Sequence, residues 1–170
     1  MSYIDPDGLI FDVTKDMHRG VSKIVSRIKR NDNIVMVVSN IALGEILMVY
    51  VEKLYSQLRV ILKKPEYTDP LYTLIRLKAD LKERFKLGYV PDRMFAYDFA
   101  ELIASVDDRI SDNDRYILAY AAADPYATKF YTTDKDIILA ARNLEETIKE
   151  KRKELNFNQL SLDILSPENY

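Results

Sequence analysis

Short apolar segments alternate with longer helical patterns along this chain, and that alternation constrains its fold more than any other feature. Residues 34–38 (IVMVV) are apolar at every position, which is typical of a strand covered on both faces of a parallel sheet. Residues 1–5 (MSYID) and 129–132 (KFYT) are also predicted to be short strands. Because strands that alternate with helices form parallel sheets, the sequence predicts an α/β fold with a central parallel sheet.

The helices are predicted from hydrophobic periodicity and from residues that begin or end a helix. Ser39 or Asn40 can cap the helix after the second strand. Ser111 can begin a later helix, which stops at Asp124-Pro125. The predicted helices cover residues 14–30, 40–64, 71–86, 93–106, 111–123 and 136–155, and residues 160–165 form a last strand or an extended tail. The chain of 170 residues fits a single domain, residues 1–170.

The composition excludes several kinds of site. The chain has no cysteine, so disulfides, thiolate nucleophiles and the common structural zinc sites are excluded. His18 is the single histidine, and none of the four glycines lies in a nucleotide-binding pattern. Carboxylates are abundant, with 27 acidic against 25 basic side chains and a net charge of −2. Nucleic-acid-binding proteins are usually basic, so this balance does not by itself favour that class.

Neither membrane insertion nor export is indicated by the sequence. No apolar run approaches the roughly 20 residues that a membrane-spanning helix needs. The opening residues, MSYIDPDGLIF, lack the basic start and the small-residue cleavage site of a signal peptide. We therefore expect a cytoplasmic protein with no membrane partner.

Four carboxylates lie where regular elements begin or end. Asp5 ends the first predicted strand, and Glu45 lies in the first turns of the helix after the second. Asp114 lies in the first turn of a later helix, and Asp134 closely follows residues 129–132. Because ligand sites of parallel sheets form outside the carboxyl ends of the strands, we expect these acids to converge. Converging carboxylates repel each other unless a cation neutralises them, and oxygen ligands select Mg²⁺ or Mn²⁺.

A simpler interpretation exists for each of these acids taken alone. Asp and Glu near the first turn of a helix interact favourably with the helix dipole, and Asp is a common capping residue. Any one of the four carboxylates could therefore serve only to stabilise a helix.

The four acids lie within four short motifs that resemble those of the PIN-domain nucleases, including the VapC-type toxin ribonucleases. The motifs occur in the family's order: YIDPDGLI at residues 3–10, SNIALGEIL at 39–47, DRYILAYA at 114–121 and FYTTDKDI at 130–137. Each is weak alone, but all four in order on the expected elements are fairly specific.

This resemblance implies a three-layer α/β/α fold and hydrolysis of RNA phosphodiester bonds. It assigns Mg²⁺ or Mn²⁺ to four ligands and adds Thr132 as a residue that orients a carboxylate or a metal-bound water. The implied catalytic and metal-binding residues are Asp5, Glu45, Asp114 and Asp134. The resemblance also implies a homodimer, and an inhibitory antitoxin protein if the chain is the toxin of a toxin–antitoxin pair.

The chain departs from the family pattern in three places. Residues 65–110 form a longer, helical insertion, and residues 150–170 extend past the usual end. Asp7 stands where the family commonly has Asn or Ser, which adds charge to the site. Asp7, Asp112 and Asp136 are reserve ligands, for which a solvated or capping role is favoured.

Two other surfaces have alternative interpretations. Basic residues recur along one face of the helix predicted at 14–30, where they either contact an RNA backbone or form a solvated face. These are Lys15, Arg19, Lys23, Arg27 and Arg30. Apolar, tyrosine-rich helices at 46–62 and 66–108 favour a dimer, and tyrosines such as Tyr50, Tyr55, Tyr116 and Tyr120 are expected in a core or interface rather than in base stacking.

Two alternatives to a toxin ribonuclease stay open. One is an RNA-processing or DNA-directed PIN nuclease that has no antitoxin. The other is a catalytically weak PIN-like module that binds RNA or protein. Acids at all four motif positions favour an active enzyme, because unneutralised carboxylate repulsion is costly.

Overall fold

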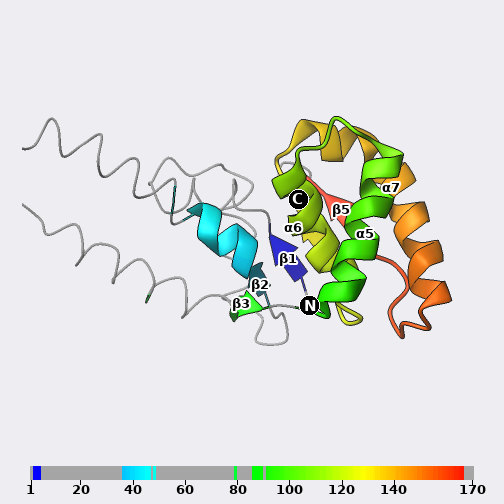
Figure 1. The fold of residues 1–170 in the computed structure, drawn as a ribbon, viewed down its shortest axis with the longest axis horizontal. Coiled ribbons are helices and arrows are strands. Elements are labelled where there is room, and N and C mark those ends of the chain that lie inside the picture. The colour runs from blue at the N-terminus through cyan, green and yellow to red at the C-terminus, as the bar shows by residue number, and fades with distance from the viewer. Residues whose placement is uncertain are drawn as a thin grey trace, which may run out of the picture.

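The computed structural model describes residues 2–4, 36–46, 48, 79, 86–89 and 91–166. The labelled elements are β1 (Ser2–Ile4), β2 (Met36–Ser39), β3 (Lys86–Tyr89), α5 (Arg93–Val106), α6 (Asp112–Ala123), β4 (Lys129–Tyr131), α7 (Lys135–Glu154) and β5 (Asp163–Leu165) (Figure 1). A further helix covers residues 40–46, directly after β2.

The strands form one parallel sheet in the order β3-β2-β1-β4-β5. The central strand is β1, where Tyr3 pairs with Val37 of β2 on one side and with Phe130 of β4 on the other. Val37 and Val38 point to opposite faces of the sheet and both are buried, as are Phe130 and Tyr131, as expected of strands covered on both faces. The prediction of an α/β fold with a central parallel sheet is confirmed.

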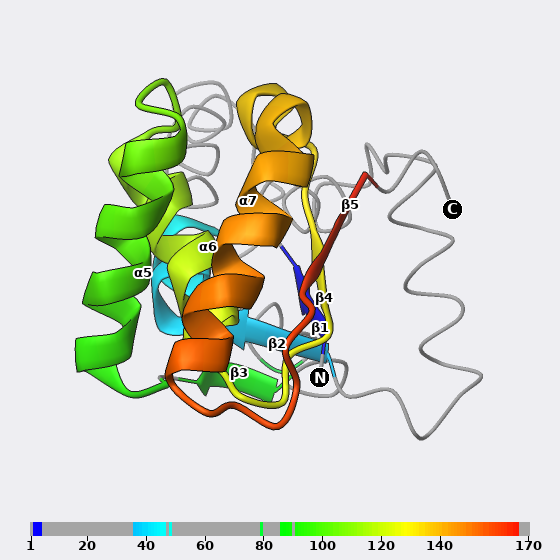
Figure 2. The same cartoon turned by 90° about the vertical axis from the view of Figure 1, so that its right-hand side faces the viewer.

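Helices α5, α6 and α7 lie together on one side of the strands (Figure 2). The second half of α6, from Ile117 to Ala123, is buried at every position, and four of these seven residues are alanines. A helix that is apolar all round must be covered on all sides, and small side chains let its neighbours approach closely. Helix α6 is therefore the centre of the described core.

The predicted ends of several helices agree with the structure because their capping residues act locally. Asp92 accepts a hydrogen bond from the Met94 backbone N at 2.9 Å and caps α5, which covers the predicted residues 93–106. Ser39 Oγ accepts one from the Ala42 backbone N at 3.2 Å at the start of the helix 40–46. Residues 160–165 contain a strand rather than an extended tail, since β5 pairs with β4.

The insertion predicted as helical contains a strand. Lys86 was expected to end a helix begun at residue 71, whereas Lys86–Tyr89 forms β3 beside β2. Gly88 weakens the strand character of this segment, so periodicity does not reveal it. The strand exists because the backbone of β2 offers hydrogen-bonding groups to any short extended neighbour, whatever its side chains. The described part of the insertion therefore contains both a strand, β3, and a helix, α5.

Arg152 of α7 is completely buried, and it joins three parts of the fold. Its guanidinium donates to the backbone oxygens of Ala121, Ala122 and Asp124 at the end of α6, at 2.8, 2.9 and 3.1 Å. It also donates to backbone oxygens before β4 and β5, which are those of Ala127, Gln159 and Ser161. A cation at this end of α6 satisfies terminal carbonyls and the helix dipole together.

Burial lowers the pKa of Arg152 to about 10, while the carboxylate of Asp124 and Tyr3 act in the opposite direction. The guanidinium therefore stays charged at neutral pH. Asp124 is itself fully buried, and its Oδ2 accepts a hydrogen bond from the Tyr3 hydroxyl at 2.9 Å. The buried positive charge of Arg152 is thus balanced by the buried carboxylate of Asp124, which is bonded to Tyr3 of the central strand.

Several predictions fall outside the described residues. They include the helix at 14–30 with its basic face, most of the tyrosine-rich helix at 46–62, and most of the helix at 71–86. Within the part of the chain that is described, no helix is both long enough and apolar enough to span a bilayer.

Candidate metal site

The strand order defines one place where ligands are expected. From β1 the chain moves to β2 and β3 on one side of the sheet, and then returns to β4 and β5 on the other. The boundary between β1 and β4 is therefore the point where the strand order reverses. Ile4 pairs with Tyr131 at the carboxyl ends of these two strands. In open parallel sheets, ligands bind outside the carboxyl ends of the strands at such a point.

Thr132 and Asp134 follow β4 at this edge. Thr132 is buried, and its Oγ1 accepts a hydrogen bond from the Asp134 backbone N at 3.0 Å. Asp134 is the N-cap of α7, with its Oδ1 accepting from the Ile137 backbone N at 2.8 Å. A carboxylate has about four lone-pair positions, so this capping bond does not exhaust it. Thr132 thus holds in place the residue that carries the candidate ligand.

Glu45 lies on the helix that follows β2, one strand further along the same edge. Its side chain is half-buried, and the carboxylate oxygen Oε2 is buried. Burying a carboxylate is costly unless hydrogen bonds or cations compensate it, so a buried carboxylate oxygen at this edge suits a metal ligand.

Asp114 lies in the first turn of α6, two residues after the helix begins. The N-cap Ser111 accepts a hydrogen bond from the Asp114 backbone N at 3.3 Å, and its hydroxyl is bonded to the Asp114 carboxylate. Ser111 thus caps α6 and also donates its hydroxyl to the Asp114 carboxylate, which gives the acid at this position a structural role. Asp114 and Asp134 therefore both have structural roles whether or not they bind a metal.

The structure does not describe a complete set of the four predicted ligands. Asp5 and Asp7 lie outside the described residues, although Asp5 directly follows Ile4 in the sequence. Among the residues that are described, no three acidic or histidine side chains form a group able to hold a metal ion. Glu45, Asp114 and Asp134 thus do not make a metal site by themselves, and a site would require Asp5.

The reserve acids Asp112 and Asp136 have ordinary structural settings. The Asp112 side chain is 86% exposed and forms an ion pair with Arg115 at 2.9 Å. Asp136 lies in the first turn of α7, where an acid favours the helix dipole, and its charge acts on Arg109. A solvated or capping role describes both residues without a metal.

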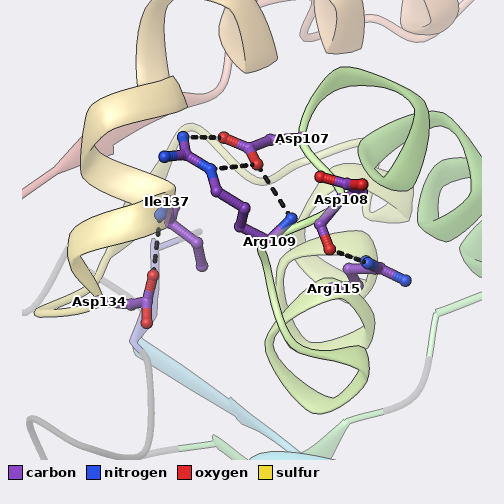
Figure 3. A network of polar contacts seen from close by, with 6 residues as sticks. All are labelled: Asp107, Asp108, Arg109, Arg115, Asp134 and Ile137. Atoms are coloured by element: carbon purple, nitrogen blue, oxygen red, sulfur yellow. Dashed lines mark hydrogen bonds and ion pairs between the residues drawn. The ribbon is translucent and has the colours of Figure 1, made fainter.

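Charged side chains of the α5–α6 turn lie beside the start of α7 (Figure 3). Arg109 contacts Asp107 through two nitrogens, with Nε to Oδ1 at 2.9 Å and Nη2 to Oδ2 at 2.6 Å. Arg115 donates to the Asp108 backbone oxygen at 2.8 Å. Nothing in the local sequence pattern distinguishes Asp107, Arg109 or Arg115 from other surface charges, so these contacts were not predicted.

The side-chain hydrogen bonds from Arg109 lower the pKa of Asp107 to about 2, from an ordinary value of 3.8. A lowered carboxyl pKa favours the folded state above the unfolded value, and this contribution is lost as the pH falls from about 4 through about 2. We expect NMR titration to give this low pKa in the native protein and a value closer to 3.8 in Arg109→Gln. Arg142→Gln, a change at an exposed arginine of α7, should leave the pKa of Asp107 low. An equal rise in both variants would contradict the assignment.

Comparison with known proteins adds no relative: the chain matches no protein-family model, no curated protein and no solved structure. The evidence for a function therefore comes from the residues of the candidate site and from the sheet that carries them.

Proposed function

We propose that this protein is a metal-dependent endoribonuclease of the PIN type, with a three-layer α/β/α fold. The observation that carries the proposal is the strand order, in which β1 lies between β2 and β4. Three of the four motifs that resemble the family begin on these three adjacent, parallel strands, whose carboxyl ends share one edge of the sheet, and this supports the expectation that the motif acids converge there. The remaining motif, at residues 114–121, lies on α6, which packs against β4.

The residues suit a hard divalent cation. The four candidate ligands, Asp5, Glu45, Asp114 and Asp134, offer only carboxylate oxygens, and such donors select Mg²⁺ or Mn²⁺. The hydrogen bonds to Asp114 and Asp134 each occupy only part of the carboxylate, which can still bind a metal ion. A bound metal would supply hydroxide near neutral pH and stabilise charge on the phosphate.

The protein's own contribution is to hold the carboxylates in place. Thr132 fixes the backbone of Asp134, and α7 fixes its side chain through the Ile137 bond. Ser111 does the same for Asp114 at the start of α6. Ligands held on rigid elements before the metal arrives lose little freedom on binding it. The proposal includes single-stranded RNA as substrate, a homodimer as the working form, and an antitoxin partner if the protein is a toxin.

Incubation of the purified protein with end-labelled single-stranded RNA tests the proposal. We expect cleavage with Mg²⁺ or Mn²⁺ and none with EDTA, because the carboxylates alone cannot activate water. Asp114→Asn, purified in the same way, controls for contaminating ribonucleases, since a contaminant would cut equally in both preparations. Cleavage that persists in EDTA, or in Asp114→Asn at the native rate, would contradict the proposal.

A second candidate is a module that binds RNA or protein without cutting. One observation favours it: the Asp134 carboxylate caps α7, and the Asp114 carboxylate accepts a hydrogen bond from the α6 cap Ser111, which explains both acids without a metal. This candidate predicts RNA binding that is unchanged by EDTA, with no cleavage under any metal. The same incubation therefore distinguishes the two functions.

A further inference from the structure

A hollow of about 340 Å³ lies between the helix at 40–46 and helices α5 and α6. The described residues that line it are Ile41, Ala96, Tyr97, Tyr116 and Tyr120. Its volume is at the lower end of the range for small-molecule pockets, roughly 300–1,000 Å³. Three of these five residues are tyrosines, so the walls combine flat aromatic rings with hydroxyl groups.

Tyr97 is the exposed member of this group, with 61% of its surface accessible to solvent. Its ring meets the ring of Tyr116 edge to face, with centroids 5.9 Å apart and planes at 89°. Tyr116 is half-buried and Tyr120 is buried, so they hold the inner wall while Tyr97 stands at the opening. An aromatic ring braced by a second ring but open to solvent is ready to stack on a flat ligand.

We propose that this hollow binds one unstacked nucleobase of a single-stranded RNA. The ring faces suit any base, because every base has a π-face, and the tyrosine hydroxyls suit the polar edges of a base. The inference rests on the proposed function, since it names a binding position for the substrate of the same site.

The helices that line the hollow also carry candidate metal ligands. Glu45 lies four residues after Ile41, and Asp114 lies two residues before Tyr116. At about 1.5 Å per residue, each acid is displaced along its helix by about one turn or less from a residue that lines the hollow. Glu45 also lies on the same face of its helix as Ile41, whereas Asp114 and Tyr116 lie on different faces of α6. A base held in the hollow would therefore adjoin the candidate site on the side of Glu45.

The binding test uses a short fluorescent single-stranded RNA and anisotropy, with EDTA present so that no cleavage occurs. The measurement is repeated with Mg²⁺ on Asp114→Asn, in case a cation is needed for binding. Tyr97→Ala should weaken binding about 5- to 140-fold, the equivalent of the ~1–3 kcal/mol typical of one stacked base. Tyr97→Leu, which keeps apolar volume but removes the ring, should weaken binding similarly, whereas Tyr97→Phe should stay within about twofold.

Tyr126→Ala provides a matched control. Tyr126 is 60% exposed, nearly the same as Tyr97, but it lies in the turn between α6 and β4 and does not line the hollow. Its removal should change RNA affinity by no more than about twofold. The salt dependence of binding should be unchanged in Tyr97→Ala, because that variant removes no positive charge.

An abasic oligonucleotide of equal length separates base contacts from phosphate contacts. The native protein should bind it more weakly than RNA, and Tyr97→Ala should bind both with similar affinity. Equal effects of Tyr97→Ala and Tyr126→Ala, or no RNA binding under either condition, would overturn the inference. So would light scattering that shows Tyr97→Ala turning a dimer into a monomer, because the hollow would then contact a second copy.

Separate measurements test base binding in the hollow and RNA cleavage at the metal site. If the native protein cuts RNA with Mg²⁺ but Tyr97→Ala leaves affinity and KM unchanged, the function stands and the base site is wrong. If RNA binds with the expected dependence on Tyr97 but no metal supports cleavage, the base site stands and the nuclease function is wrong. If both stand, Tyr97→Ala should raise KM more than it lowers kcat at saturating RNA.

Discussion

Asp114→Asn should lower the rate of metal-dependent RNA cleavage by at least a hundredfold, while the protein stays folded. Residues that only support a metal ligand are typically worth about 10–100-fold, so the loss of a ligand itself should exceed that range. Asn keeps the size of Asp and can still bond Ser111, so the capping geometry of α6 survives. The loss is therefore expected in the chemistry and not in the fold, and cleavage rates at saturating Mg²⁺ measure it.

Asp112→Asn is the matched control for this change. Asp112 occupies the same first turn of α6 and faces the same helix dipole, but its side chain is exposed and paired with Arg115. Both variants remove one charge from the turn, which should alter metal-free stability by no more than about 1 kcal/mol. If Asp112→Asn loses as much activity as Asp114→Asn, the effect belongs to the helix end and not to a metal ligand.

Thermal melts add a measurement that does not depend on activity. A cation bound only by the folded protein contributes about 2.7 kcal/mol at a hundredfold excess over its Kd. At about 2–4 °C per kcal/mol for a chain of this size, Mn²⁺ should raise the native Tm by about 5–11 °C. Asp114→Asn should show little of this rise, whereas Asp112→Asn should show all of it. Equal shifts in the native protein and Asp114→Asn would assign Asp114 to helix capping alone.

Arg152→Met should destabilise the protein by roughly 3–5 kcal/mol, the cost of removing one partner from a buried charged network. Met has a similar length, so the main loss is electrostatic: six backbone hydrogen bonds disappear and the buried Asp124 carboxylate loses its nearby cation. The corresponding fall in Tm is about 6–20 °C. Chemical denaturation followed by circular dichroism gives the free energy of unfolding directly.

Arg142→Met tests whether the effect belongs to the buried position. Arg142 lies on the same helix, but its side chain is 90% exposed and its ion pair with Glu146 is long, at 3.7 Å. Exposed pairs of this kind contribute between about 0 and 1 kcal/mol, so Arg142→Met should be nearly neutral. If the two variants were equally stable, Arg152 would not hold α6, β4 and β5 together.

The position of Arg152 in the sequence pattern of α7 marks it as a buried cation. Ala140, Leu144 and Ile148 are buried along one stripe of α7, and Arg152 is the next position on that stripe. An arginine on an apolar stripe near the end of a helix indicates a buried cation that needs carbonyl partners. Asp124 is harder to recognise, because Asp124-Pro125 has the ordinary pattern of a helix end.

Elements whose causes are local could be predicted from the amino-acid sequence. Helix α5 begins and ends at the predicted residues, and Ser111 caps α6 as expected, because capping and periodicity act within a few positions. The apolar segments at β1, β2 and β4 were recognisable for the same reason. Asp114 and Asp134 lie at helix starts, as predicted from their positions, whereas the role of these acids and of Glu45 as metal ligands stays a prediction.

Local patterns could not predict which elements become neighbours. The place of β1 between β2 and β4, the edge strand β3, and the tyrosine-lined hollow all depend on contacts between segments distant in the chain. The hydrogen bond from Tyr3 to Asp124 joins residues 121 positions apart. Such pairs form because burial leaves polar groups no partner but each other, and that requirement arises only once the core has assembled.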